Sequence, residues 1–282
     1  MDALRTFASS NRGSIINVVY VVAFLVVLYY LYKFLIAGSD LEVNILDVEV
    51  DANTPNGYVI SKKPDVRVKQ GGEYTISFWM YISSWDYRSG LAKSVLQIVD
   101  NKKSSEYSLL TTVLYPNEQK LMVRVHTDSD KNSATDYTKR VNFDQLLSGS
   151  GAQSMYAPTM ETPMCDLQDI DLQRWINITV SVNGRIVDVY YDGKLARSCV
   201  LPDIPSAPET GLQSIVIGQK GGFGGKISGI QFFAYPLTPD RIYSIYQAGP
   251  RGAAGFLGYI AEKMGIKLTY SGAKAQQKAF LL

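Results

Sequence analysis

The sequence predicts an all-β protein: an antiparallel β-sandwich preceded by one N-terminal transmembrane helix and followed by a short C-terminal helical tail. Three observations lead to this prediction. The 19 Tyr and 10 Phe among 282 residues favour strands over helices. The stretch from Cys165 to Cys199 has the pattern of a tight β-meander. The run from Gly13 to Tyr32 contains no charged residue.

The meander is the most regular part of the chain. Apolar residues alternate with polar ones from Ile176 to Asn183, which is typical of a strand with one buried face. Asn183-Gly184 and Asp192-Gly193 then give two tight turns, since both residue types tolerate positive φ. A meander needs a second sheet to cover its apolar face, and this requirement predicts a sandwich.

The composition excludes several classes of function. The net charge of +2 gives no field that would favour nucleic acid. With one histidine, His126, and two cysteines, most zinc sites are excluded, as is Ser-His or Cys-His catalysis that does not use His126. An enzyme that uses carboxylates alone remains open. We expect no cofactor and no catalytic residue.

The N-terminal region divides into a polar segment, 1–12, and an apolar segment, 13–37. The apolar span of about 22 residues would measure roughly 33 Å as a helix, enough to cross a bilayer. A cleaved signal peptide and a buried core helix are the alternatives. The lipid-facing anchor is expected to include Ile15, Val19, Phe24, Leu28 and Leu31. The basic residues lean towards a cytoplasmic N-terminus by a margin of one charge, so orientation stays open.

The first expected strand carries three carboxylates. Leu46, Val48 and Val50 alternate with Asp47, Glu49 and Asp51. Such a row could form a glycosidase acid pair or a calcium site. We interpret it as the solvent face of a strand because no other segment supplies the matching group.

Further strands follow at Glu73–Ile82, Val95–Val99, Tyr107–Tyr115, Gln119–His126 and Leu212–Gly218. Residues 144–174 are irregular in pattern. The glycine-rich run after Gly218 leads into another strand rather than a helix, so we interpret it as a turn and not as a phosphate loop. Thr238-Pro239-Asp240 begins a helix that ends at Gly249-Pro250. The tail, 251–282, is basic.

A polar loop after His126 offers weak calcium candidates. Asp128, Asp130 and Asn132 have the spacing of the start of an EF-hand loop. However, Ser133 replaces the glycine expected at position six, and Lys139 replaces the acid expected at position twelve. An exposed hairpin tip is the simpler interpretation, and we expect no metal.

The two cysteines lie at similar distances from the Asn183-Gly184 turn, so an antiparallel arrangement would bring Cys165 and Cys199 together. A disulfide would stabilise the domain by roughly 3–4 kcal/mol. Two unpaired thiols remain the alternative. The Asn177-Ile178-Thr179 glycosylation sequon falls inside a strand, and we expect it to be unoccupied.

Three motifs resemble a known family. Phe78-Trp79, the run from Trp175 to the Tyr190–Lys194 turn, and the Leu237–Gly249 helix occur in the order found in laminin-G-like, concanavalin A-like jelly rolls. The resemblance covers about 41–250. Some members of that superfamily hydrolyse β-glucans and others bind glycans through calcium, but the acidic patterns here depart from both.

A narrower resemblance concerns Leu172 to Pro205, which is similar to membrane-anchored versions of this domain in large icosahedral double-stranded DNA viruses of algae and protists. It implies a non-catalytic, single-pass minor capsid protein that links an internal virion membrane to the capsid shell. Its partners would be membrane lipid and capsid proteins. The alternative is a membrane-anchored, glycan-binding, lectin-like protein. No nucleic-acid partner is expected.

Overall fold

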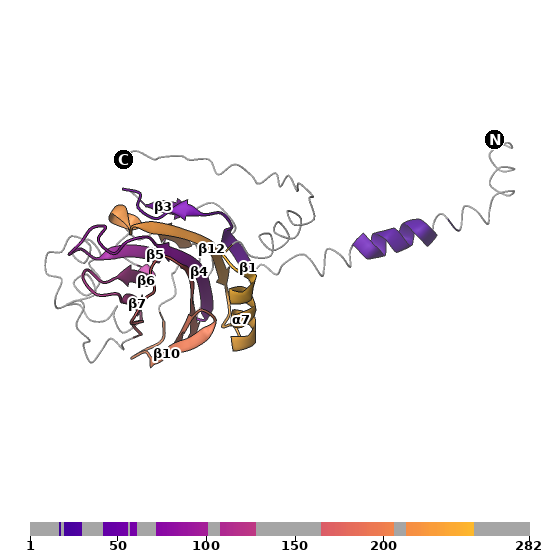
Figure 1. Ribbon diagram of the computed structural model, residues 1–282. Helices are drawn as coiled ribbons and strands as arrows, with labels where there is room; N and C mark the ends of the chain where they lie inside the picture. Colours follow the sequence, from indigo (N-terminus) through magenta and orange to yellow (C-terminus); the bar gives the residue numbers. More distant parts are fainter. Residues whose placement is uncertain are drawn as a thin grey trace, which may run out of the picture. The chain divides into compact units, whose positions relative to one another are not determined.

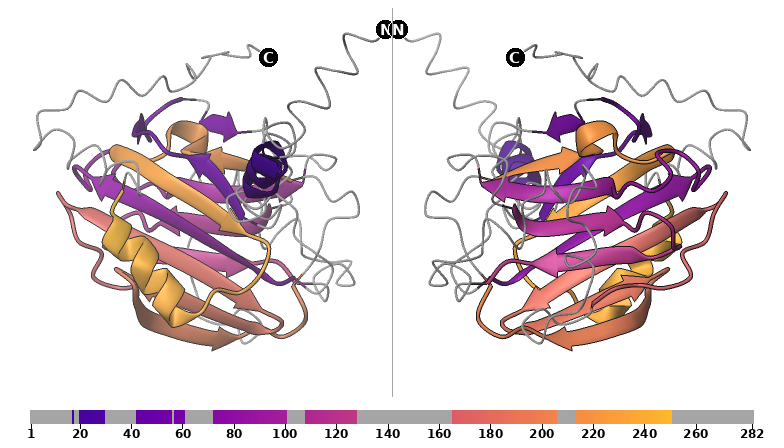
Figure 2. Two further views of the ribbon diagram at one scale, coloured as in Figure 1. Left: turned by 90° about the vertical axis from the view of Figure 1, so that its right-hand side faces the viewer. Right: turned by 90° about the vertical axis from the view of Figure 1, so that its left-hand side faces the viewer.

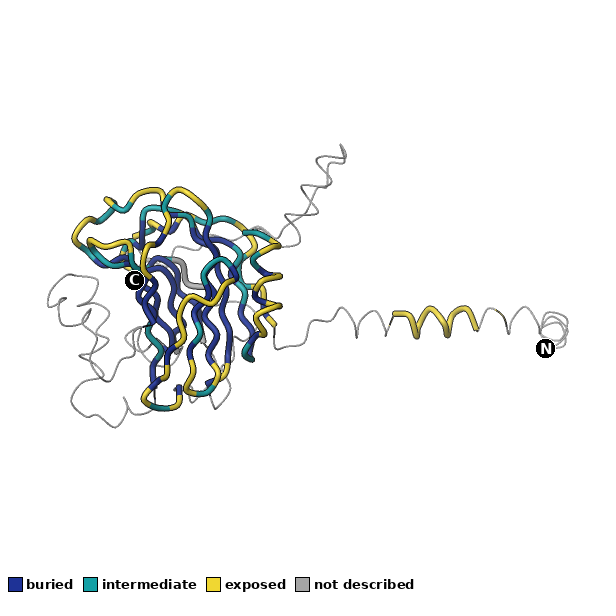
Figure 3. The backbone as a smooth tube through the Cα atoms, turned by 60° about the horizontal axis from the view of Figure 1, so that its bottom comes forward, coloured by how far each residue is buried: buried dark blue, intermediate teal, exposed yellow. Residues whose placement is uncertain are grey.

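The computed structural model describes residues 17, 20–29, 42–55, 57–60, 72–100, 108–127, 165–205 and 213–250. The chain divides into two compact units, Met1–Glu42 and Val43–Leu282. In the first unit, residues 20–29 are helical, and their large apolar side chains are exposed (Figure 3). Within the described residues, no helix is long and apolar enough to cross a membrane.

The strands of the second unit form two mostly antiparallel sheets (Figure 1). The seven-stranded sheet has the order β1 (Glu42–Leu46), β12 (Gly225–Phe233), β4 (Tyr74–Ile82), β8 (Trp175–Asn183), β9 (Ile186–Tyr191) and β10 (Lys194–Val200), with β2 (Val50–Asp51) also paired to β12. The five-stranded sheet has the order β3 (Tyr58–Ile60), β11 (Gln213–Ile217), β5 (Lys93–Asp100), β6 (Ser108–Leu114) and β7 (Leu121–Val125). The predicted β-sandwich is therefore confirmed at this level.

The predicted meander is β8, β9 and β10. Gly184 (φ 55°) makes the first turn, and Asp192 (φ 49°) with Gly193 (φ 74°) makes the second. Register pairs Val180 with Val189 across the first hairpin. Because the turn residues tolerate positive φ, local sequence alone sets this part of the topology.

The core consists of alternate residues on the paired strands. Ile76, Phe78 and Met80 on β4 are fully buried, as are Leu96 and Ile98 on β5. The burial colouring shows strands that are dark blue along most of their length, with yellow concentrated in the turns (Figure 3). Burial of each such side chain contributes roughly 1.5–3 kcal/mol.

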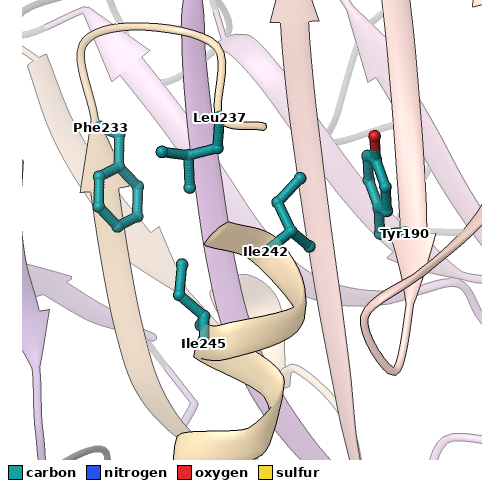
Figure 4. Close-up of a cluster of buried hydrophobic side chains, with 5 residues drawn as sticks. All are labelled: Tyr190, Phe233, Leu237, Ile242 and Ile245. Atoms are coloured by element: carbon teal, nitrogen blue, oxygen red, sulfur yellow. The ribbon is translucent and has the colours of Figure 1, made fainter. Parts of the chain in front are cut away.

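The seven-stranded sheet is also buried on its outer face, because α7 (Pro239–Ala248) lies across it (Figure 2). Ile242 and Ile245 of α7 form a buried cluster with Tyr190, Phe233 and Leu237 (Figure 4). The predicted helix is confirmed between Thr238 and Gly249, although the Thr238 side chain makes no capping hydrogen bond.

Polar side chains beneath α7 bond to one another instead of to water. Thr75 Oγ1 accepts from the Leu237 N–H (3.0 Å) and donates to the Tyr235 carbonyl (3.0 Å). Asn177 Nδ2 donates to Ser77 Oγ (3.1 Å). The sequon asparagine is thus fully buried in the folded domain, which explains why occupancy is not expected.

The first strand departs from the prediction. β1 ends at Leu46 and β2 begins at Val50, and the intervening Val48 is 55% exposed instead of buried. The alternation therefore does not run along one continuous strand. β1 ends, and the chain turns away from the sheet before β2 pairs with β12. Glu49 forms an ion pair with Lys226 (3.5 Å), while Asp47 and Asp51 are exposed as expected for a solvent face.

Candidate functional site

The calcium candidates Asp128, Asp130 and Asn132 lie outside the described residues. Among the residues that the structure does describe, no group of three or more His, Cys, Asp or Glu side chains could hold a metal ion. His126 is buried directly after β7.

The described anchor residues are Phe24 and Leu28, and both are exposed on the helical stretch 20–29. Ile15, Val19 and Leu31 lie outside the described residues. The basic tail, 251–282, also lies outside them.

Cys165 and Cys199 form a disulfide, with their Cα atoms 5.9 Å apart. The prediction of a pair is confirmed, and the alternative of two unpaired thiols is wrong. The bond joins the segment that leads into β8 to the edge strand β10. It therefore fixes the segment that leads into the meander.

One end of the sandwich gathers six aromatic residues at the ends of strands and in the β4–β5 loop. All six are half-buried, in contrast to the buried aromatic residues of the core. We call this set the aromatic end: Tyr81, Trp85, Tyr87, Tyr115, Trp175 and Tyr191. The rings of Tyr81 and Trp175, on the neighbouring strands β4 and β8, lie 5.7 Å apart.

Hydrogen bonds between distant loops bring this end together. Tyr87 Oη donates to the Gly221 carbonyl (2.9 Å), and the Ser83 N–H donates to the Gly224 carbonyl (2.8 Å). The adjacent Gly225 is required, because a Cβ there would lie 2.0 Å from the Tyr81 carbonyl oxygen. The glycine-rich run is thus a turn, as predicted, and its backbone supports the aromatic loop.

Three buried polar atoms at this end have no hydrogen-bond partner: Thr54 Oγ1, Trp85 Nε1 and Gln219 Oε1. They come from three separate loops that meet at the glycine-rich turn. A buried polar group without a partner costs roughly 1–3 kcal/mol, which makes each of the three notable.

Two of these loops also hold strained backbone. Arg88 (φ 50°) and Lys220 (φ 55°) occupy the left-handed region, and Arg88 Nη1 donates to the Lys220 carbonyl. Non-glycine residues in this region cost of order 1–3 kcal/mol and cluster at functional sites. Arg88 and Lys220 thus lie in the same two loops as the unpartnered atoms of Trp85 and Gln219.

Lys93 is a buried cation beneath Trp85. Its Nζ lies 5.1 Å from the Trp85 ring centroid and donates to the Pro116 carbonyl (3.2 Å). Burial lowers the pKa of Lys93, and the positive charge of Arg88 lowers it further. Asp86 acts in the opposite direction. The ammonium group fixes one face of the indole, since cations are attracted to aromatic faces.

Arg174 organises the part of the aromatic end that belongs to β8 and β9. It bonds to Asp171, forms an ion pair with Asp192 (2.7 Å) and lies 5.7 Å from the Tyr191 ring centroid. The hydrogen bond from Arg174 holds the pKa of Asp171 below its usual value. Burial raises the pKa of Tyr191 to about 12. The carboxylates of Asp171 and Asp192 are therefore both engaged by Arg174.

Asp166 anchors the same end to the five-stranded sheet. It accepts hydrogen bonds from Tyr115 Oη (2.6 Å), from the Val123 N–H (3.2 Å) and from Arg124, with which it forms a nearly buried ion pair. Burial raises the pKa of Tyr115, and its hydrogen bond to Asp166 raises it further.

Sequence reasoning missed this site. The run Ser83 to Gly90 gave a usable signal, because Trp85 and Tyr87 stand in a polar turn where aromatic residues have no core to fill. Asp166 gave no signal, since its hydrogen-bond partners lie far away along the chain. Gln219 gave none, because the segment around Gly57 that lies beside it is also distant in sequence.

No family model matches the sequence, and no curated protein sequence matches it. The structure is similar to the binding domain of botulinum neurotoxin serotype D, with a TM-score of 0.43, 14% identity and coverage of 63% of this chain and 37% of that chain. It is also similar to the serotype D ligand binding domain in complex with N-acetylneuraminic acid. The TM-score is 0.42 and the identity 13%, and the match covers 74% of this chain and 42% of that chain. A third similar structure is the binding domain of botulinum neurotoxin DC in complex with rat synaptotagmin II. Its TM-score is 0.42 and its identity 14%, and the match covers 67% of this chain and 39% of that chain.

This chain therefore spans less than half of each of those chains. Because these TM-scores and identities are low, the function is argued from the residues of this chain.

Proposed function

We propose that this protein is a non-enzymatic, glycan-binding module, built on a jelly roll of the concanavalin A type and held at a membrane by its N-terminal apolar segment. The glycan site is the aromatic end. This proposal corresponds to the lectin-like alternative of the sequence prediction. The order of the Phe78-Trp79, Trp175 and α7 motifs along the sandwich supports the fold type.

The observation that carries the proposal is the coincidence of half-buried aromatic rings with unpartnered polar atoms. A sugar ring presents apolar C–H faces and a rim of hydroxyl groups. The faces match the half-buried rings of Trp85 and Trp175. The unpartnered Trp85 Nε1 and Gln219 Oε1 are buried, and they would meet hydroxyl groups only when a ligand parts the loops. Binding sites of this kind combine apolar surface with a few polar groups.

The charges of the aromatic end favour binding over hydrolysis. A glycosidase needs two carboxyl groups that are free to act as acid and base or nucleophile. Here Arg174 engages both Asp171 and Asp192, and Asp166 is engaged by Arg124. These acids hold the loops in place.

The membrane tether rests on residues 13–37. The uncharged run from Gly13 to Tyr32 and the exposed apolar side chains of 20–29 support it. Alkaline carbonate extraction of the full chain from membranes tests this part: retention supports a tether, and release contradicts it. The capsid-linking role in a virion stays a prediction, which mass spectrometry of purified particles would test.

The glycan site is tested with the full chain in nanodiscs, first on a glycan array and then by titration with the best ligand. We expect Trp85→Ala and Trp175→Ala each to weaken binding about tenfold, since one stacked ring contributes roughly 1–2 kcal/mol. Tyr243→Ala on α7 is the control, because Tyr243 is an exposed aromatic residue outside the aromatic end.

Circular dichroism of each variant checks that the sandwich remains folded. Binding that both tryptophan variants retain would overturn the assignment of the site, and an array with no ligand would overturn the glycan itself. Loss of binding in EDTA would favour a calcium-dependent site at Asp128, Asp130 and Asn132 instead.

A further inference from the structure

The five-stranded sheet is buried on both of its faces. Register pairs Gln97 on β5 with Thr111 on β6 and with Val216 on β11, and paired residues point to the same face of a sheet. Val113 shares this face with Thr111, two residues away, and pairs with Met122 on β7. We call this set the covered face, because each member is between 0 and 7% exposed: Gln97, Thr111, Val113, Met122 and Val216.

The disulfide shows which face of each sheet points into the sandwich. On β9, Val187 pairs with Cys199 and lies three residues from Tyr190, so Val187 and Tyr190 point to opposite faces. Tyr190 belongs to the cluster under α7 (Figure 4), and Cys199 therefore points away from α7 and into the sandwich. Cys165, which is bonded to Cys199 and 3% exposed, lies between the sheets.

The position of Cys165 fixes the direction of Met122. Leu167 lies two residues after Cys165 and pairs with Leu121, so Leu121 also points into the sandwich. Met122 is the next residue on β7, and it points outwards together with the rest of the covered face. The covered face is therefore the outer face of the five-stranded sheet.

No described helix or strand lies across β5 and β6 on this outer side, whereas α7 lies across the other sheet (Figure 2). The covered face is nevertheless shielded from water. Both amide atoms of Gln97 are buried and have no hydrogen-bond partner, which water would supply at an open surface. The covered face therefore needs a layer from outside the described ranges, and that layer is apolar over Gln97.

The segment 128–164 begins and ends beside this sheet. It follows Thr127, just after β7, and it leads into Cys165. Beyond Cys165, Leu167 and Leu121 exchange two backbone hydrogen bonds of 2.9 Å, so the returning chain lies along β7. The 37 residues from 128 to 164 reach about 120 Å when extended, whereas the five strands span roughly 20 Å. The segment is long enough to cross the covered face and return.

The other segments outside the described ranges fit this face less well. The tail, 251–282, follows Pro250, whose carbonyl accepts from Ser228 Oγ (2.9 Å) on β12 of the other sheet. Residues 61–71 join β3 to β4 of the other sheet. The short segments at 101–107 and 206–212 lead directly into the next strand of the same sheet.

The second half of the segment 128–164 has the composition of a buried layer. From Val141 to Met164 there is no Lys or Arg, and the acids are Asp144 and Glu161. Methionine side chains fill irregular gaps against apolar surface. The large apolar residues of this half are Val141, Phe143, Leu146, Leu147, Met155, Tyr156, Met160 and Met164.

We propose that residues 128–164 pack across the outer face of the five-stranded sheet, with 141–164 on Val113, Met122 and Val216. The nearly buried ion pair of Arg124 and Asp166 lies where the segment returns to the sheet. Each sheet then has its own outer layer, α7 on one and this segment on the other. The outer face of the five-stranded sheet is thereby occupied by the chain itself and is not available to a ligand.

The test uses the full chain in nanodiscs, with the photo-crosslinking residue p-benzoylphenylalanine in place of Tyr156. After illumination, mass spectrometry maps the residues to which position 156 becomes bonded. We expect most adducts on peptides from β5, β6, β7 and β11, since these strands carry the covered face. Circular dichroism checks the fold, and the same replacement at Phe143 tests the same contact if the Tyr156 variant does not fold.

The matched control places the crosslinker at Tyr259 in the tail, which should give few adducts on those four strands. Equal yields from positions 156 and 259 would overturn the assignment of the segment, as would adducts from position 156 mainly on the other sheet. A mixture of isotopically light and heavy chains detects a second copy. Adducts that mainly join a light chain to a heavy one would overturn packing within one chain.

Discussion

Aromatic side chains gather in two regions of this domain, and the two regions differ in what covers them. Under α7, Trp79 stacks on Tyr246 with ring centroids 5.8 Å apart, and Phe233 and Tyr190 are buried. At the aromatic end, Trp85 and Trp175 are half-buried and no helix lies over them in the described structure.

The difference lies in what satisfies the polar atoms nearby. Beneath α7, hydroxyl and amide groups such as Thr75 and Asn177 find partners within the protein. At the aromatic end, Trp85 Nε1 and Gln219 Oε1 find none. The polar groups beneath α7 are satisfied within the protein, and some of those at the aromatic end are not. Stability and binding should therefore respond to different substitutions.

The largest effect is expected in the covered region. Phe233→Ala should lower the free energy of unfolding by about 3–5 kcal/mol, because it leaves a cavity between β12 and α7. Trp85→Ala at the aromatic end should cost about 1 kcal/mol, since its ring is already in contact with solvent. Urea unfolding followed by circular dichroism measures both. Equal losses would erase the distinction between the two regions.

The disulfide lies towards the Asn183-Gly184 turn, since Cys199 pairs with Val187 on β9. Replacing Cys165 and Cys199 together by serine should lower stability by about 3–4 kcal/mol, as expected for a closed loop with a sequence separation of 34 residues. Unfolding of the variant is compared with that of the oxidised and reduced parent chain. A reduced parent that is as stable as the oxidised one would show that the disulfide adds no stability to this segment.

Asp166 provides the next comparison. Asp166→Asn should cost about 3 kcal/mol, because it leaves the Arg124 guanidinium nearly buried without a counter-charge. A double-mutant cycle with Arg124→Ala separates the pair energy from the loss of each side chain. A coupling energy near zero would mean that the Tyr115 and Val123 bonds hold Asp166 without help from Arg124.

The smallest effect concerns Asp171, which is half-exposed and bonded to Arg174. Its pKa is lower in the folded state than in the unfolded chain, so its contribution is complete above the unfolded pKa of about 3.9 and is lost as pH falls through the folded value. Asp171→Asn should remove less than about 1 kcal/mol of this acid-dependent stability. The free energy of unfolding is measured between pH 2.5 and 7 for the parent chain and for the variant. If the bond contributes nothing, the free energy of unfolding will depend on pH in the same way in both.

The sequence predicts the parts of this fold that local signals set. Asn183-Gly184 and Asp192-Gly193 define the meander because each turn needs only its own residues. The disulfide follows from the same hairpin geometry. Val48 fails as a prediction, since the break between β1 and β2 depends on pairing with β12, far along the chain.

The candidate site could not be predicted, because it depends on long-range contacts. Tyr87 meets the Gly221 carbonyl across 134 residues, and Val123 meets Asp166 across 43. Neither periodicity nor turn chemistry encodes such meetings. The aromatic loop was visible in sequence, but its unpartnered atoms were not.

The Cys165–Cys199 bond also has a mechanical consequence. A domain that is tethered at one end and bound to a ligand carries load along its chain, and a covalent bridge removes the enclosed residues from the path of that force. With a separation of 34 residues, the bridge would shorten the extension on forced unfolding by roughly 110–120 Å. Strands β8 and β9 would then stay linked under tension, and a single-molecule pulling trace would lengthen by this amount on addition of a reductant.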